Sequence, residues 1–230
     1  MRAALVAIGL VLSAAPALAQ TSDAFPPAIS VTGEARISVA PDIAFVDAGV
    51  ATDARTAREA SEANNTTMTK VFAALKAANI DARDIQTSRL SLQPQYAPNR
   101  SGPSPIAGYR ASNRVTVRIH DVSKVASVID TLVGSGANDI GNVAFEVSQA
   151  SKLLDDAREK AVADARRKAE IYAKAAGVTL GAPLSISEGG APQPMFRAKA
   201  VAGMAAAPTP IAQGEETLSV SVSVTWAIRQ

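Results

Sequence analysis

The sequence predicts an α+β protein with a ferredoxin-like split βαβ lobe and a second lobe formed by the long C-terminal helix and strands from both chain ends. Between residues 43 and 147, strand and helix patterns alternate in the order βαββαβ. This order is typical of folds in which two helices cover one face of an antiparallel sheet. One long helix and several strands remain on either side, and they need partners to bury their apolar faces.

The longest predicted helix runs from Ser151 to Gly177 and carries an alanine at every fourth position: Ala157, Ala161, Ala165, Ala169 and Ala173. A step of four residues advances about 400° around a helix, so these small side chains wind slowly along one side. They allow close packing against a sheet or another helix. Gly177 suits a left-handed C-cap.

Charges along this helix follow the order that the helix dipole favours, with acids early and bases late. Three acid-first i,i+4 pairs are expected to add stability: Asp156 with Lys160, Asp164 with Lys168, and Glu170 with Lys174. The basic run at 166–168 is interleaved with acids. We therefore interpret it as a solvated face, not as a nucleic-acid patch.

Residues 1–19 have the pattern of a signal peptide. Arg2 precedes an apolar run, and Ala17-Leu18-Ala19 predicts cleavage between Ala19 and Gln20. No cysteine stands at the cleavage point, which excludes a lipoprotein anchor. An uncleaved anchor is the alternative, but the run is short for a membrane span and no later stretch approaches about 18 apolar residues. We expect an exported, periplasmic chain with no transmembrane span after cleavage.

Composition excludes several classes of chemistry. The 230 residues contain no cysteine, so disulfides, thiol catalysis, iron–sulfur clusters and thiolate zinc sites are impossible. The net charge of +2 falls to +1 when Arg2 is removed, which does not indicate a polyanion partner. Alanine and valine supply much of the apolar content, in keeping with helices that lie close to a sheet.

In chain order, residues 20–28 form a short polar lead and residues 29–39 a strand. A second strand at 43–52 alternates apolar and polar positions. Thr56-x-x-Glu59 is a capping box that predicts a helix to about Ala78. Its buried stripe is Met68, Val71, Leu75 and Ala78, and Asn79 can take the left-handed cap position.

The next predicted strands cover residues 85–93 and 109–119, separated by a Pro/Gly/Ser-rich excursion at 94–108 that we expect to be flexible and exposed. Asp121 or Ser123 caps a helix with apolar residues at i, i+3, i+4 and i+7, and Gly134 and Gly136 end it. A strand at 140–147 precedes the long helix.

Beyond that helix, residues 183–188 form a short predicted strand and residues 189–215 a low-complexity, flexible loop. From Leu218 to Ile228, apolar residues alternate with serine and threonine, which predicts a strand with one buried and one polar face. The polar face is either solvated or, if this is an edge strand, a subunit interface.

Several stretches taken together resemble the SIMPL-domain family. They are Val31-Thr-Gly-Glu, Pro41-Asp42, Asn64 with Met68, Asp84-Ile-Gln-Thr, Gly108-Tyr-Arg-Ala-Ser-Asn-Arg-Val-Thr-Val, Gly136-Ala-Asn-Asp-Ile, Phe145, and the alanine-rich helix. They span roughly residues 29–188 in order. The family's opening often reads Gly-x-Gly, whereas this chain has Ala35 at the second position, so the backbone there need not take a glycine-only conformation.

We expect one SIMPL-like domain at residues 29–230. The order of the patterns places a βαββαβ lobe at 43–147, and the second lobe would combine residues 29–39, 148–188 and 216–229. The resemblance itself implies export, oligomers that can be ring- or channel-like, and a link with oxidative-stress tolerance. The family has no agreed catalytic residues, so none is carried over.

Hydrolytic and metal chemistry find little support in the sequence. His120 is the single histidine, so a Ser-His-Asp arrangement has one possible base, and a structural or surface role fits it better. A transition-metal site needs several converging ligands. Gly136-x-x-x-x-Gly141 lacks the Lys-Ser/Thr of a phosphate loop. We expect no catalytic residue, no metal and no cofactor.

Arg110, Arg114 and Arg118 stand at even offsets on one predicted strand, so they share the face opposite Val115 and Val117. They either pair across strands with carboxylates such as Glu146 or Asp47, or form an anion- or partner-binding face.

We expect a non-enzymatic protein that forms homo-oligomers, or meets envelope partners, in the periplasm or loosely at the outer membrane. It would support envelope or oxidative-stress tolerance. The alternative is a ligand-binding or channel-like assembly for a small anionic molecule.

Overall fold

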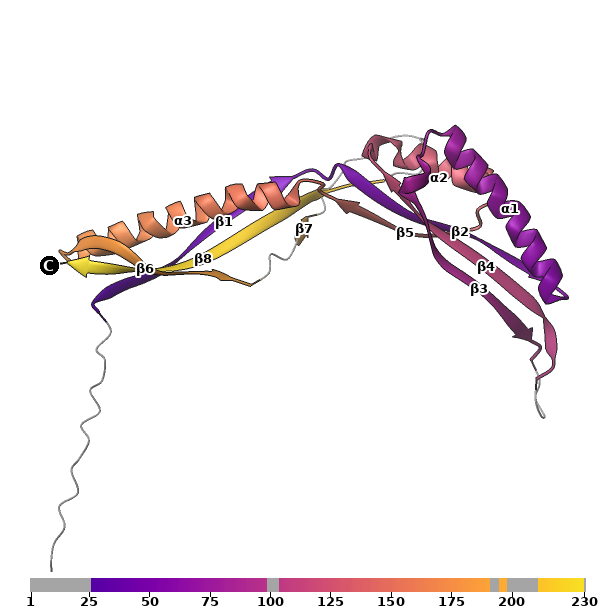
Figure 1. The fold of residues 1–230 in the computed structure, drawn as a ribbon, viewed down its shortest axis with the longest axis horizontal. Coiled ribbons are helices and arrows are strands. Elements are labelled where there is room, and N and C mark those ends of the chain that lie inside the picture. Colours follow the sequence, from indigo (N-terminus) through magenta and orange to yellow (C-terminus); the bar gives the residue numbers. More distant parts are fainter. Residues whose placement is uncertain (1–25, 99–103, 191–194, 198–210, 230) are drawn as a thin grey trace, which may run out of the picture.

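The computed structural model describes residues 26–98, 104–190, 195–197 and 211–229, and it confirms the α+β class. Two antiparallel sheets lie end to end in a long, bent molecule (Figure 1). The predicted signal peptide, most of the predicted N-terminal lead and most of the loop at 189–215 lie outside the described residues.

The first sheet contains residues 43–146 in the strand order β3-β4-β2-β5, with every neighbouring pair antiparallel. Its elements are β2 (Ile43–Ala54), α1 (Ala57–Ala77), β3 (Ile85–Tyr96), β4 (Ile106–Ile119), α2 (Val125–Gly134) and β5 (Asp139–Glu146). Two 3-10 turns, η1 (Ala82–Asp84) and η2 (Val122–Lys124), precede β3 and α2. Helices α1 and α2 cover one face.

The ends of α1 follow from its sequence. Thr56 accepts a hydrogen bond from the Glu59 N–H while the Glu59 carboxylate accepts one from the Thr56 N–H, so both halves of the capping box form. Asn79 takes the left-handed conformation, with φ of 62°. Of the predicted buried stripe, Met68, Val71 and Leu75 contribute to the core of this sheet, whereas Ala78 at the end of the helix is only partly buried.

The second sheet joins the two chain ends. Its elements are β1 (Ala28–Val39), α3 (Ala150–Ala175), β6 (Thr179–Gly189), β7 (Met195–Arg197) and β8 (Glu215–Arg229). Strand β8 pairs with β1 on one side and with β6 and β7 on the other. All five alanines of the α3 stripe are buried against this sheet, as predicted.

Gly33 explains how closely α3 approaches β1. A Cβ on Gly33 would lie 2.0 Å from the Ala161 carbonyl oxygen and 2.5 Å from the Ala165 nitrogen. Gly33 does not have a positive φ, so this position needs glycine for space. Ala35, two residues on, is buried in the same core and also lacks a positive φ. The expectation that residue 35 needs no glycine is therefore confirmed.

Several predicted boundaries were wrong. The excursion at 94–108 is shorter than expected, because β3 continues to Tyr96 and β4 begins at Ile106. Pro94 can extend β3 because this is an edge strand, where a missing N–H costs no ladder bond. Strand β6 also exceeds its predicted range.

The last strand is not at an edge. Strand β8 is paired on both sides, so its backbone cannot recruit another chain by edge pairing. This removes the interpretation of its polar face as an edge-strand subunit interface. Hydroxyls on that face bond across strands, as between Thr32 and Ser223 at 3.1 Å. Of the three predicted ion pairs along α3, Asp164 with Lys168 forms, whereas Glu170 pairs with Arg166.

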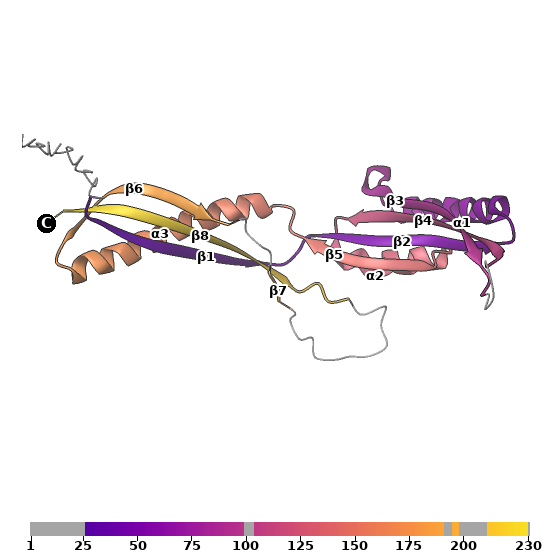
Figure 2. The same ribbon diagram turned by 90° about the horizontal axis from the view of Figure 1, so that it is seen from below.

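Both sheets leave their uncovered faces on the same side of the molecule. The helices lie on the outer side of the bend in Figure 1, and the view from below in Figure 2 has the strands of both sheets in front of them. The chain passes between the two sheets at residues 40–42 and 147–149, which we call the waist. There Asp42 accepts a hydrogen bond from the Ser148 N–H at 2.7 Å and another from the Ser148 hydroxyl. Both hydrogen bonds lower the pKa of Asp42, and the one from the hydroxyl has the larger effect.

Candidate functional site

The three arginines of the predicted binding face lie on β4, on the uncovered side of the first sheet. Val115, Val117 and Ile119 alternate with them and are buried under the helices. The shared face is therefore as expected. Their neighbours across the sheet decide how much of this positive charge is available to a ligand.

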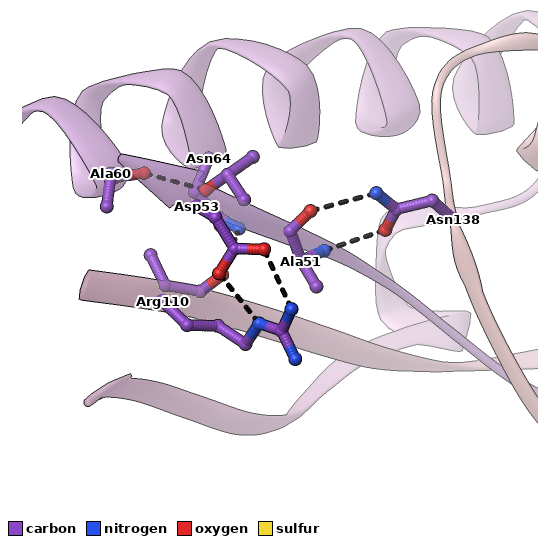
Figure 3. A network of polar contacts seen from close by, with 8 residues as sticks. Ala51, Asp53, Ala60, Asn64, Arg110 and Asn138 are labelled. Atoms are coloured by element: carbon purple, nitrogen blue, oxygen red, sulfur yellow. Dashed lines mark hydrogen bonds and ion pairs between the residues drawn. The ribbon is translucent and has the colours of Figure 1, made fainter. Parts of the chain in front are cut away.

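Arg110 is bound by a carboxylate directly across the sheet. Its Nε and Nη2 donate to the two Asp53 oxygens at 2.8 and 2.7 Å, a bidentate pair between β4 and β2 (Figure 3). The hydrogen bond from Arg110 holds the pKa of Asp53 below its usual range. Both side chains are more than half exposed, so this pair contributes more to orientation than to stability.

Arg114 is also bound by a carboxylate, but from β5, the strand on the far side of β2. Its Nη2 donates to an Asp139 oxygen on β5 at 2.5 Å, and this hydrogen bond raises the pKa of Arg114. Thr116 donates to Asp47 at 2.6 Å on the same face. The arginines thus pair with carboxylates across the sheet, but with Asp53 and Asp139 and not with Glu146 or Asp47 as their hydrogen-bonding partners.

Arg118 differs from the other two. Its guanidinium carbon lies 6.0 Å from the centroid of the Phe45 ring, within the range of a cation–π contact. Within the described ranges it forms no ion pair with a carboxylate. Arg118 is thus the member of the predicted face whose charge no carboxylate ion pair offsets among the described residues.

A pocket opens at the end of the sheet where β4 finishes. It has a volume of about 310 Å³ and lies between the loop after α1, η1, and the segment from Arg118 to Lys124. His120 belongs to it, with Nε2 3.0 Å from an Asp84 oxygen. The Asp84 side chain is only 10% exposed, and its contact with Nε2 fixes the position of the His120 ring. No histidine or carboxylate group in the part that the structure covers has the arrangement of a metal site.

Two asparagines occupy structural positions that periodicity did not reveal. Asn138 uses its side chain as a peptide group, accepting from the Ala51 N–H and donating to the Ala51 carbonyl, both at 2.8 Å (Figure 3). Asn64, 1% exposed on α1, donates to the carbonyls of Val50 and Ala111 at 2.7 and 3.2 Å. Both side chains fix other elements to the backbone of β2, and Asn64 also reaches β4.

Comparison with known proteins places the chain in a family. The model of the SIMPL family, described as a protein of unknown function (DUF541), matches residues 29–226. The chain belongs to the SIMPL family. It is 39% identical to the 26 kDa periplasmic immunogenic protein of Brucella melitensis over 226 residues, which is 93% of this chain and 90% of the relative.

More distant SIMPL relatives are uncharacterised proteins named YggE. That of Edwardsiella ictaluri is 31% identical over 160 residues, covering 70% of this chain and 67% of the relative. That of Escherichia coli K12 is 29% identical over the same length, covering 70% and 65%. The helices that the structure describes include none long and apolar enough to cross a membrane.

The stretches by which the chain resembles the SIMPL family have structural roles in this protein. Gly33 leaves space for α3 to pack on β1, Asp42 accepts a hydrogen bond from Ser148, and Asn64 bonds α1 to the backbone of β2. Arg110 and Arg114 bind across strands. The charged groups of the uncovered face are therefore largely paired with one another, which leaves less of the Arg110 and Arg114 charge available to a ligand.

Proposed function

We propose that this SIMPL-family protein is exported, is cleaved between Ala19 and Gln20, and works in the periplasm as a non-enzymatic protein that acts by self-association. The signal-peptide pattern of residues 1–19 supports export. The name of the Brucella melitensis relative, a periplasmic immunogenic protein, supports the compartment.

The observation that carries self-association is the exposed apolar edge of the first sheet. Leu90 and Leu92 on β3 are 73% and 48% exposed. They share the helix side of the sheet, opposite Asn113 and Ala111, but β3 lies at the edge beyond α1. A long edge strand offers unpaired backbone groups, and exposed leucines beside it add an apolar surface for a second copy.

The test is the solution mass of the chain from Gln20 to Gln230, measured by light scattering on a sizing column. We expect a mass of several subunits, and a lower mass for the double variant Leu90→Lys, Leu92→Lys. Ile171→Lys is the matched control, because this side chain is 55% exposed on α3, away from β3. A monomeric parent, or a double variant that keeps its mass, would count against the proposal.

A role in envelope or oxidative-stress tolerance, in the periplasm or loosely at the outer membrane, would be indirect. The chain has no cysteine and four methionines, one of them in the signal segment, so it has little capacity to consume oxidants itself. A deletion strain should be more sensitive to peroxide than its parent. Equal sensitivity of the two strains would remove the stress role and leave the assembly untouched.

The second candidate function is binding of a small anion by the face of Arg110, Arg114 and Arg118. The observation that favours it is the lack of a carboxylate partner for Arg118 within the described chain, whereas Arg110 and Arg114 are already bound. Under this proposal the anion would sit at the Arg118 end of the strand.

A further inference from the structure

The pocket at the end of β4 combines a defined volume with concentrated charge. Its 310 Å³ lie near the lower limit of ligand pockets in proteins, so an occupant would be a small molecule. Four side chains that can carry positive charge line it: Arg83, Arg118, His120 and Lys124. Arg83 lies in η1, Arg118 in β4, His120 directly after β4 and Lys124 in η2, so the fold brings together segments up to 41 residues apart.

The carboxylates of the pocket are already engaged by the chain itself. Asp81 accepts from the Arg83 N–H at 3.1 Å and thereby caps η1. Asp121 caps η2, accepting from the Ser123 N–H at 3.1 Å and from its hydroxyl. Asp84 is held by His120. These acids organise the two turns and the histidine, and that function accounts for their presence beside the basic groups.

The basic groups are less completely engaged. The Lys124 Nζ lies 3.7 Å from Asp121, beyond hydrogen-bonding distance. The Arg83 Nε is 3.4 Å from Asp81, a long contact for a side chain that is 82% exposed. Arg118 rests on the Phe45 ring. The lining holds three carboxylates and three permanently positive side chains, and Arg118 is the cation among them that forms no ion pair with a carboxylate of the described residues.

We propose that this pocket binds a small oxyanion, a phosphate or a dicarboxylate, with Arg118 and Lys124 as its main ligands and His120 at its edge. A guanidinium presents paired donors that match both carboxylate and phosphate oxygens, and an ammonium adds a point charge. The inference rests on the second candidate function and narrows it from the whole arginine face to one end. It does not depend on self-association, which the mass measurement tests separately.

The single histidine makes the test specific. Every helix and strand that the structure describes lies within Gln20–Gln230. Because the sequence has one histidine, this tag-free chain labelled with ¹³C-histidine gives one imidazole signal, that of His120. Sodium phosphate and sodium succinate are titrated separately at fixed pH and ionic strength. We expect at least one of them to shift the signal saturably. The two anions distinguish a phosphate ligand from a carboxylate ligand, and a response to either supports the pocket.

Variants locate the bound anion. Arg118→Gln should weaken binding about tenfold or more, since it removes charged hydrogen bonds. Arg110→Gln is the matched control, because Arg110 lies on the same strand and face but outside the pocket. Lys124→Gln serves if Arg118→Gln changes the fold. No saturable shift with either anion would overturn the proposal. Equal weakening by Arg110→Gln would also overturn it, and would place the anion along the strand.

Discussion

Several polar side chains form hydrogen bonds to strand backbone that a neighbouring strand would usually form. Asp164 on α3 accepts from the Glu34 N–H of edge strand β1 at 3.1 Å, and Lys168 donates to the Thr32 carbonyl at 2.8 Å. Asn138 does the same for β2. An edge strand whose N–H and carbonyl groups are occupied by its own helix is less open to pairing with another chain. This difference directs our assembly proposal to β3.

Glu216 is a buried residue whose ionised carboxylate is disfavoured in the folded state. It is 7% exposed at the start of β8, and burial, followed by the charge of Glu146, raises its pKa above the ordinary value of 4.5. A carboxyl group with a raised pKa in the folded state binds its proton more tightly there than in the unfolded chain. Its contribution to stability therefore falls as the pH rises from the ordinary value through the raised one.

We predict that Glu216→Gln raises the free energy of unfolding at neutral pH, because a neutral side chain replaces a buried charge. The gain should disappear below about pH 4, where the native side chain is also neutral. Denaturant unfolding at several pH values measures this. Glu188→Gln is the control of opposite sign, since the hydrogen bond from Arg158 lowers the pKa of Glu188. A Glu216→Gln effect independent of pH would contradict the prediction.

At the scale of elements, the packing of α3 on β1 governs the second sheet. The alanine stripe brings the helix backbone close to the strand, and Gly33 is where they meet. Glu34 and Thr32, on either side of it, are then within reach of Asp164 and Lys168. Close packing and the hydrogen bonds of this edge therefore depend on the same position.

We predict that Gly33→Ala destabilises the protein by about 3 kcal/mol or more, because the new methyl group meets helix backbone, which cannot move aside without displacing α3. Gly189→Ala in β6 is the matched control. A Cβ there would meet its nearest atom, the Ser221 oxygen, at an ordinary 3.8 Å, and the change should be within about 1 kcal/mol of neutral. Equal thermal stability of the two variants would show that α3 can shift at little cost.

The sequence predicted the helices well because their signals are local. The Thr56 capping box, the left-handed Asn79 and the alanine stripe each depend on residues a few positions apart. Strand ends were less predictable, since β3 continues through Pro94 only because it is an edge strand. Whether a strand lies at the edge or in the centre depends on the order of strands in the sheet, which local patterns do not show. The central position of β8 could not be predicted for the same reason.

The candidate site was predictable in part for a related reason. Periodicity places Arg110, Arg114 and Arg118 on one face, and the structure agrees. Their partners depend on register: Asp53 lies directly opposite Arg110, and Asp139 lies two strands away from Arg114. The pocket at the end of β4 combines separate charged segments that look like solvated surface in the sequence. The one available signal was the lone histidine beside an acid.

On the scale of the whole molecule, the two sheets have separate cores. One lies between α1, α2 and the first sheet, and the other between α3 and the second sheet. The segments that join them cross at the waist, where Asp42 and Ser148 are bound. Ile211, just before β8, packs against the first core. Few side chains belong to both cores, so each should unfold largely by itself.

We predict two thermal transitions in the chain from Gln20 to Gln230, each sensitive to one core. Asn64→Asp should lower only one, by about 10 °C or more, because it puts a carboxylate against the Val50 and Ala111 carbonyls in a site 1% exposed. Gly33→Ala should lower only the other. Differential scanning calorimetry of the two variants and their combination separates the cases. A single transition that either change lowers would mean that the waist couples the cores, and the bend of the molecule would then be a fixed feature of its surface.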